Sequence, residues 1–309
     1  MAVITSTIRL SKKFTGRLIT DMIILDLQAT LVAAALVHAT PRKGIVAAPI
    51  SEGLIRNTML TSVLAIKNKF PKEFAEGGLT LALDSRSWRR DYFPHYKARR
   101  SADRDKSVVD WAELMRIINL VRAELVEFFP YNAISVQGAE ADDIIAVLTQ
   151  DHFSEMFGPR GVIVSGDKDF KQLHWANVSQ WDHVNKKYIE CHNPAEFLLE
   201  HIIEGDKGDG IPNALSGGDC FVTSTRQTPL TKERLDELKI FREKHPKFGA
   251  GFARNEKLID LGRIPSEVVN AIRSAYEAEK MRVKPAKSGL IKYCMQRNLK
   301  TLVERISEF

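Results

Sequence analysis

The sequence predicts an α/β fold with a mostly parallel central sheet, flanked by helices, and a helical C-terminal region. Three short apolar runs, at 22–26, 79–84 and 161–165, indicate buried strands of a parallel sheet. Stretches with helical spacing separate these runs, and repeated alternation of strand and helix is typical of α/β proteins. Aspartates end the first two runs and follow the third closely, at the sheet edge where such proteins bind ligands.

The elements of this sheet domain follow from apolar spacing along the chain. Helices are indicated by apolar residues that recur every three or four positions, as Leu54, Leu60 and Leu64 do. The expected helices span about 30–38, 51–69, 108–128, 141–150 and 195–203. A short strand over 133–136 and a hairpin over 178–189 are expected to continue the sheet.

The character of the chain changes near residue 217, where the strand signals end. The rest predicts helices packed against the α/β body, over about 228–246, 265–282 and 287–306. We therefore expect a basic N-terminal extension over 1–20, an α/β domain over 21–216 and a helical region over 217–309. The extension holds four cations and no acid, and it lacks the apolar core of a secretory signal.

Composition narrows the classes of function. The chain of 309 residues is 44% hydrophobic and 27% charged, as is ordinary for a globular protein. No apolar stretch reaches the roughly 20 residues that cross a bilayer, so no membrane partner is expected. The three cysteines form no CxxC pair, which argues against a zinc ribbon and fits a reducing cytoplasm. The eight histidines show no metal-binding spacing and are expected to be structural or surface residues.

Five acidic clusters are predicted to meet at one edge of the sheet. Carboxylates that converge there repel one another unless cations lie between them, and oxygen ligands favour hard divalent ions. A net charge of +6 around an acidic site favours a polyanionic substrate, although this charge is mild for the length. The candidate metal ligands are Asp26, Asp84, Glu140, Asp142, Asp143, Asp167, Asp169, Asp206 and Asp209.

Each acidic motif also has a structural explanation. The acids of GAEADD suit a helix N-terminus, where they accept backbone N–H bonds, but three acids within four positions exceed what a cap requires. Asp167 and Asp169 flank one residue after a strand, which fits either a metal pair or a turn. In GDKGDGIPN, the glycines either allow close approach of a DNA phosphate or form a simple surface turn.

A basic and aromatic stretch over 88–106 follows the second predicted strand. It interleaves seven cations with Tyr92, Phe93 and Tyr96. Cations that bind phosphates and rings that stack on bases are what single-stranded nucleic acid requires. A solvated charged loop is the alternative, but the position directly after Asp84 favours nucleic-acid binding.

Together these motifs resemble the structure-specific 5′-nuclease, or flap endonuclease, family, and most of all its branch of ribonucleases H from T-even bacteriophages. The resemblance covers about residues 20–309. It departs at GDGIPNAL, where the family often has GDNIPGV, and at YKARR, where the family has YKxNR. The motifs that recur in family order are Asp26, Asp84 with WRRDY, Tyr96 with Lys97, Glu140 with Asp142, SGDKDFKQLH, and Asp206 with Asp209.

The resemblance implies a PIN-like 5′-nuclease fold and a two-metal mechanism, normally with Mg²⁺ and with Mn²⁺ as a substitute. Asp143 matches an acid that only some family members have. The first ion would be held by Asp26, Asp84, Glu140 and Asp142, with help from Asp167. The second ion would be surrounded by Asp169, Asp206 and Asp209.

The resemblance also implies a flexible basic arch over 86–107, through which a single-stranded 5′ end passes. Lys97 and Arg89 would touch the scissile phosphate, and Tyr96 would stack on the terminal base. The candidate DNA-binding residues are Arg90, Arg99, Arg100, Lys207, Gly208 and Gly210.

The implied function is a Mg²⁺-dependent 5′→3′ exonuclease and flap endonuclease. Such an enzyme removes RNA primers and adjacent DNA from lagging-strand fragments and leaves 5′-phosphates. Its substrates are DNA and RNA–DNA hybrids with a single-stranded 5′ end, and the family implies a sliding clamp and a single-strand-binding protein as partners. We expect a monomer in the cytoplasm, which is the host's cytoplasm for a phage protein.

Three alternatives stay open. A PIN-type ribonuclease shares the fold and the carboxylates but is usually far shorter. A catalytically silent DNA-binding module would share the basic surface, and EDTA would leave its DNA binding nearly unchanged. A phosphatase of the haloacid dehalogenase type requires DxDxT after the first strand, but Gln28 stands where the second acid belongs.

Overall fold

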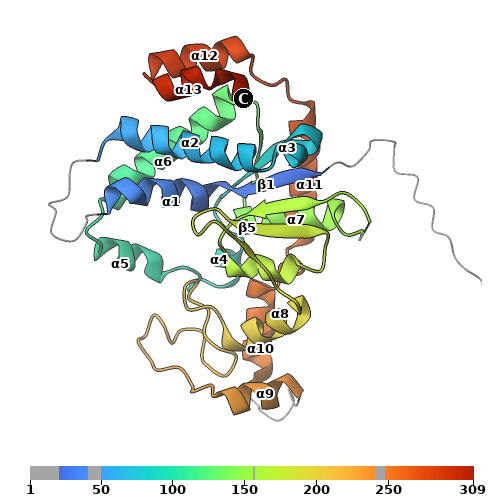
Figure 1. Cartoon of the computed structure of the whole chain (residues 1–309). Coiled ribbons are helices and arrows are strands. Elements are labelled where there is room, and N and C mark those ends of the chain that lie inside the picture. Colours follow the sequence, from blue (N-terminus) through green and yellow to red (C-terminus); the bar gives the residue numbers. More distant parts are fainter. Residues whose placement is uncertain (1–20, 41–49, 156, 241–247) are drawn as a thin grey trace, which may run out of the picture.

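A six-stranded sheet runs through the computed structural model in the order β3-β2-β1-β4-β5-β6 (Figure 1). The first five strands of the chain are parallel, and β6 is antiparallel to β5. The chain winds outward from β1 first to β2 and β3, and then to β4 and β5, which confirms the predicted α/β class. The strands are β1 (Met22–Asp26), β2 (Leu79–Leu83), β3 (Asn132–Ser135), β4 (Gly161–Val164), β5 (Val178–Asp182) and β6 (Lys187–Ile189).

The structure describes residues 21–40, 50–155, 157–240 and 248–309, without the side chains of 101–103. The predicted extension over 1–20 and the end of the helix predicted over 228–246 lie outside these ranges. No helix within them is long and apolar enough to span a membrane.

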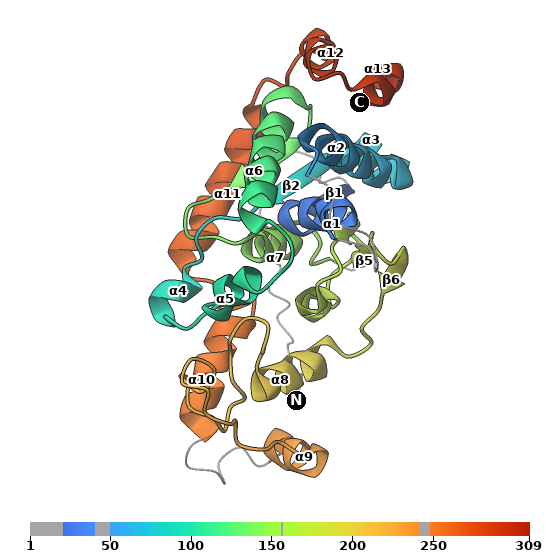
Figure 2. The ribbon, with the colours of Figure 1, turned by 90° about the vertical axis from the view of Figure 1, so that its left-hand side faces the viewer.

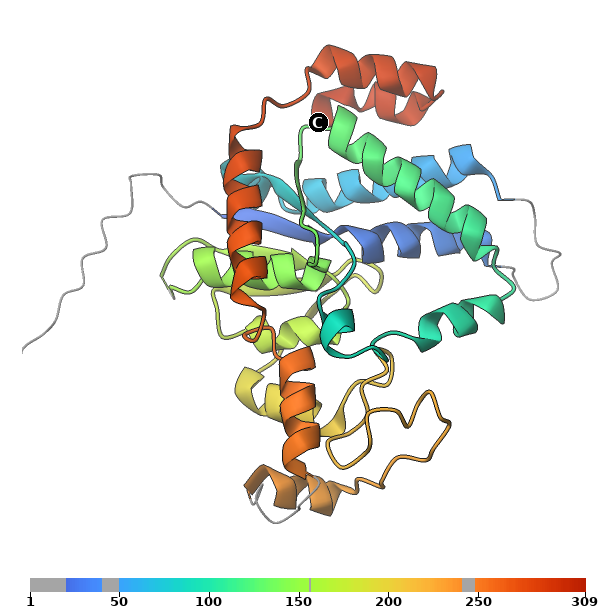
Figure 3. The same ribbon diagram turned by 180° about the vertical axis from the view of Figure 1, so that it is seen from behind.

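Helices cover both faces of the sheet (Figure 3). Side chains of β1 alternate between two cores, with Ile23 and Leu25 in one and Met22 and Ile24 in the other. The first core includes α1 (Leu27–Ala39), α2 (Glu52–Lys69), α3 (Pro71–Gly77) and α6 (Trp111–Phe128), and the last two α-helices of the chain also contribute to it. The second core holds α7 (Ala141–His152) and α11 (Ser266–Met281).

The segment predicted as an arch contains two short helices, α4 (Arg89–Tyr92) and α5 (Arg99–Asp105) (Figure 2). Between them, Phe93 and Tyr96 pack on Ile202 and Leu258, which joins the base of the arch to the helices below the sheet. Those helices are α8 (Pro194–Glu204), α9 (Lys232–Ile240) and α10 (Phe248–Ile259), and they share a small core of their own.

The C-terminal helices are divided between two ends of the structure (Figure 1). α9 and α10 lie with α8 at one end, α11 runs beside β3 and α7, and the last helices lie near α6 at the other end. The single helix predicted over 287–306 is wrong. It breaks into α12 (Lys287–Gln296) and α13 (Lys300–Glu304), because Asn298 takes a left-handed φ of 54°. The domain boundary at 216 stays a prediction.

Candidate metal centre and nucleic-acid interface

The carboxyl ends of β1, β2 and β4 bring some of the predicted acids into one cluster, which is called the crevice below. Asp26 ends β1 and caps α1, since its Oδ1 accepts the backbone N–H of Ala29 at 3.1 Å. Asp84 follows β2 and accepts the N–H of Ala141 at 2.7 Å, which ties it to the first turn of α7. Ser165, directly after β4, donates its hydroxyl to Asp26 at 3.1 Å.

Four acids of this crevice lack a cationic partner. Asp26, Asp84, Asp142 and Asp167 form no ion pair within 4.0 Å with any residue in the described ranges. Burial and the charge of Asp84 raise the pKa of Asp26 to about 7. Burial and the charge of Asp169 raise the pKa of Asp167 to about 6. A group of mutually repelling carboxylates, of which Asp26 is buried, Asp84 and Asp142 are half-buried and Asp167 is exposed, fits the donor set of a divalent cation.

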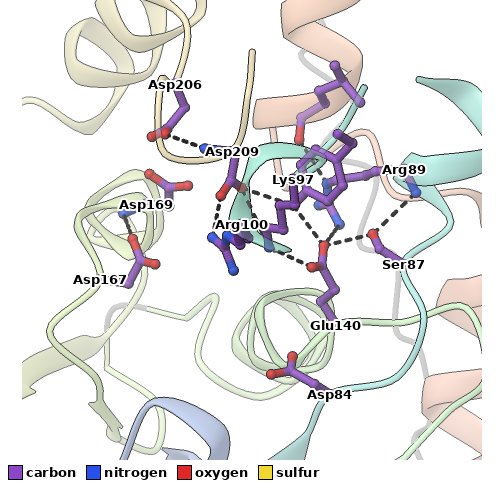
Figure 4. Close-up of polar contacts among 12 residues, drawn as sticks. Asp84, Ser87, Arg89, Lys97, Arg100, Glu140, Asp167, Asp169, Asp206 and Asp209 are labelled. Atoms are coloured by element: carbon purple, nitrogen blue, oxygen red, sulfur yellow. Dashed lines mark hydrogen bonds and ion pairs between the residues drawn. The ribbon is translucent and has the colours of Figure 1, made fainter. Parts of the chain in front are cut away.

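Glu140 is already neutralised by cations from the arch (Figure 4). Its Oε1 accepts from Nζ of Lys97 at 2.6 Å, and its Oε2 accepts from the hydroxyl of Ser87 at 2.7 Å. Burial would raise the pKa of Glu140, but the charges of Lys97 and Arg89 lower it to about 2. Glu140 therefore holds the arch residues in place as well as reaching the crevice.

Arg89 and Asp143 form a buried pair, which corrects both predicted roles. Arg89 is only 3% exposed, its Nη2 lies 2.8 Å from Asp143, and its Nε donates to the carbonyl of Leu258 at 2.8 Å. Asp143 is fully buried and accepts the backbone N–H of Glu140 at 3.0 Å, which completes a capping box on α7. Arg89 also lies 3.2 Å from Glu140, so the side chains of Arg89 and Asp143 are both engaged inside the protein.

Tyr96 is also placed differently from its predicted role. Its ring is buried at 3% exposure between the arch and the helices below, so it is not available for stacking on a terminal base. Its hydroxyl lies 2.9 Å from Glu140 and 3.0 Å from Asp209. Tyr96 thus links the acid of α7 to the loop after α8.

The GDKGDG loop, residues 205–210, positions the backbone of Lys97. The N–H of Lys97 donates to the carbonyl of Asp209 at 2.7 Å, and Lys97 itself takes a left-handed φ of 56°. Gly210 is buried with φ of 76°, and a Cβ there would lie 2.9 Å from the carbonyl oxygen of His95. Gly210 thus packs against the arch, and its contact with DNA stays a prediction.

A histidine joins the second acidic group, although the sequence suggested only structural or surface histidines. Nε2 of His201 lies 3.0 Å from Asp169 and 3.6 Å from Asp206. His201 lies in the last turn of α8, and Asp206 follows in the next loop, while Asp169 lies in the 3₁₀ helix η1 (Lys168–Leu173). No spacing in the sequence indicated this residue, because its acidic neighbours come from η1 and from a loop rather than from its own helix.

The predicted DNA-binding cations lie on the surface. Arg90, Arg99, Arg100 and Lys207 are exposed, and Arg100 pairs with Asp209 at 2.6 Å. Arg99 and Lys207 line an open groove of about 820 Å³ together with Arg226 from the loop before α9. Gly208 is exposed beside Lys207.

Comparison with known protein families gives two matches that together cover most of the chain. The family of the 5′-3′ exonuclease N-terminal resolvase-like domain matches residues 39–201. The family described as T4 RNase H, C terminal, matches residues 194–309.

Two curated relatives show the same likeness. Ribonuclease H of Enterobacteria phage T4 is 27% identical over 300 residues, which cover 93% of this chain and 95% of that protein. Flap endonuclease Xni of Shewanella sp. (strain ANA-3) is 31% identical over 137 residues, which are 42% of this chain and 48% of the relative.

Solved structures share the fold. A bacteriophage T5 flap endonuclease, in a pseudo-enzyme-product complex with DNA and metal ions, aligns with a TM-score of 0.57 at 14% identity. That alignment covers 84% of this chain and 99% of the other. A T5 5′-exonuclease with bound zinc aligns with a TM-score of 0.56 at 13% identity, over 84% and 99% of the two chains. These likenesses confirm the predicted 5′-nuclease fold.

Proposed function

We propose a specific reaction for this chain, which belongs to the 5′-3′ exonuclease family and is a nuclease of the T4 ribonuclease H type. In this proposal it uses two Mg²⁺ ions to remove RNA primers and adjacent DNA from lagging-strand fragments. The family membership agrees with the resemblance predicted from the motifs. The products would carry 5′-phosphates. Mn²⁺ would replace Mg²⁺ in this proposal.

The observation that carries the proposal is the crevice of carboxylates without cationic partners. Asp26, Asp84, Asp142 and Asp167 would hold the first ion, and Asp169 and Asp206 would hold the second. Bound divalent ions would polarise the phosphodiester and lower the pKa of an attacking water. Asp209 would not bind the second ion directly in this proposal, because its carboxylate oxygens already contact Arg100 and Tyr96.

Lys97 supplies a positive charge beside the crevice. Its amine lies 2.6 Å from Glu140 and 3.5 Å from Asp209, and its side chain is 11% exposed. The left-handed backbone and the bond to Asp209 fix this position, so the charge is in place before substrate arrives. We assign to Lys97 the stabilisation of charge that develops on the scissile phosphate, and to Glu140 the holding of Lys97.

The nucleic acid would enter along the basic side of the arch. Arg99, Lys207 and Arg226 share a groove, and their charges suit successive phosphates of a single-stranded 5′ end. Arg90 and Arg100 add charge on α4 and α5. The T5 neighbour in complex with DNA supports a DNA substrate. A sliding clamp, a single-strand-binding protein, a monomeric state and a host cytoplasm remain parts of the proposal.

Replacing the crevice acids tests the proposal. Asp84→Asn and Asp142→Asn should each abolish cleavage of a 5′-flap duplex in Mg²⁺, while the Kd for the flap changes little. Asp110→Asn is the matched control, since Asp110 is an exposed cap of α6 and belongs to none of the acidic motifs. Wild-type rates in either crevice variant would contradict the metal assignment.

Two substrates separate the remaining alternatives. Retained flap binding with no cleavage in any divalent metal would favour a silent DNA-binding module. Cleavage of RNA that lacks a free 5′ end would favour a PIN-type ribonuclease.

A further inference from the structure

We propose that Asp169, His201 and Asp206 form a metal site with one nitrogen ligand, which binds first-row transition ions such as Co²⁺ and Zn²⁺ in preference to Mg²⁺. The inference rests on the proposed two-ion function, in which this site holds the second ion. It adds the choice of ion and a ligand that the motifs do not contain.

The distances suit a single ion. One oxygen from each aspartate and a ring nitrogen of His201 all lie within 4.8 Å of one another. A bound ion places its ligand atoms at about 2.0–2.2 Å from itself, so ligand atoms about 3–4 Å apart need only small shifts. The two closest contacts, 3.0 Å to Asp169 and 3.6 Å to Asp206, both involve Nε2 of His201.

Two of the three ligand atoms are buried without a hydrogen-bond partner in the described part of the chain. They are Oδ1 of Asp169 and Nε2 of His201, which are close but do not meet hydrogen-bond geometry with each other. His201 is 4% exposed. Buried polar atoms left unsatisfied cost about 1–3 kcal/mol each, and a shared cation would satisfy both.

The surroundings hold this geometry. Phe197, one helical turn before His201, stacks on the imidazole at 5.7 Å with an interplanar angle of 25°. The backbone N–H of Asp209 donates to Oδ1 of Asp206 at 3.0 Å, which leaves Oδ2 toward the histidine. Lys168 contacts that Oδ2 at 2.8 Å, but its side chain is 52% exposed and is free to swing into solvent when an ion binds.

The chemistry of the ligands sets the preference. Mg²⁺ is a hard ion that favours oxygen and keeps much of its water, whereas imidazole suits Zn²⁺ and related ions. The first site is built from carboxylates alone and has no ligand of this kind. The two sites should therefore differ in selectivity: where both kinds of ion are available the site at His201 binds the transition ion, and with Mg²⁺ alone it holds the second Mg²⁺ of the proposed function.

Metal binding to the full chain, after removal of metal and without nucleic acid, tests this directly. Co²⁺ titration followed by its visible absorption bands should give one tight site in the wild type, and calorimetry should give weaker Mg²⁺ binding. His201→Gln should weaken Co²⁺ binding by at least about tenfold and leave Mg²⁺ binding nearly unchanged. The matched control is His38→Gln, because His38 is exposed on α1 and, within the described residues, its side chain hydrogen-bonds only to Thr58.

A second variant, His201→Asp, keeps a ligand at this position but replaces the nitrogen by oxygen. Its retained Mg²⁺ binding would show that the variant is folded. It should retain Mg²⁺ binding while the ratio of Co²⁺ to Mg²⁺ affinity falls by about tenfold or more. An unchanged Co²⁺ affinity and spectrum in both variants would overturn the inference. Absence of cleavage with intact His201-dependent Co²⁺ binding would instead refute the proposed nuclease mechanism and leave the metal site standing.

Discussion

Replacing Asp26 by asparagine should stabilise the metal-free protein at neutral pH. Asp26 is 6% exposed, and burial together with the charges of Asp84 and Asp167 raises its pKa from 3.8 to about 7. Asparagine retains both hydrogen bonds, because its amide oxygen can cap Ala29 and its amide nitrogen can donate to Ser165. The substitution therefore removes a buried charge and little else.

The raised pKa determines the sign and the pH window of the effect. The native state binds the proton of Asp26 more tightly than the unfolded chain does. The wild-type protein is therefore not destabilised by this group below about pH 4, and the destabilisation grows as pH rises to about 7 and the carboxyl becomes charged. A pKa difference of roughly three is worth on the order of 4 kcal/mol, at about 1.4 kcal/mol for each tenfold change. Because several carboxylates share this repulsion, we expect Asp26→Asn to gain about 2–4 kcal/mol at pH 8 and almost nothing at pH 4.

Urea unfolding in excess EDTA at pH 4, 6 and 8 measures this difference. Asp110→Asn is the matched control, since it changes another aspartate cap but at an exposed helix start. Adding a divalent ion in excess over EDTA should make the wild type more stable than Asp26→Asn, because the ion binds the native state and the variant lacks one of its ligands. A variant no more stable than wild type at pH 8, or equally stabilised at pH 4, would refute the repulsion argument.

Three further substitutions test the arch and its supports. Lys97→Ala should slow single-turnover cleavage by about 10²–10³-fold with little change in flap Kd, and an unchanged rate would remove Lys97 from the reaction. Asp143→Asn should cost about 1.5–3 kcal/mol in urea unfolding, because buried Arg89 loses one of its two acidic partners and keeps only Glu140, whereas a loss of metal binding at full stability would restore Asp143 as a ligand. Gly210→Ala should cost about 1–3 kcal/mol and slow cleavage, because Gly210 has a left-handed φ and a Cβ there would lie too close to His95. The control is Gly53→Ala in α2, where a Cβ meets no neighbouring atom within 4 Å. Equal effects of the two substitutions would contradict the claim that the loop of Gly210 positions Lys97.

The sequence predicted those parts of the site that depend on strands. A short apolar run can be recognised as a buried strand, and acids at the ends of neighbouring parallel strands must meet. Asp26 and Asp84 follow from this argument alone. Burial of Asp26 and its lack of a cation then agree with a donor set for a metal ion.

The parts that depend on tertiary packing were beyond the sequence. Arg89 and Asp143 lie 54 positions apart, and nothing in either motif indicates that α4 docks on α7 and pairs them. Tyr96 is aromatic and polar, so it suits a base-stacking surface equally well until Ile202 and Leu258 are seen to bury it. His201 lacks any metal-binding spacing, because its partners come from η1 and from a loop rather than from its own helix.

End-labelled cleavage of a primer–flap duplex tests the central claim most directly. With Mg²⁺, a 5′-labelled flap strand should release short labelled products, and a 3′-labelled strand should shorten from its 5′ end. EDTA should stop both reactions. Products that begin at the 3′ end, or tight flap binding with no cleavage in Mg²⁺ or Mn²⁺, would contradict the account of this chain as a metal-dependent 5′-nuclease.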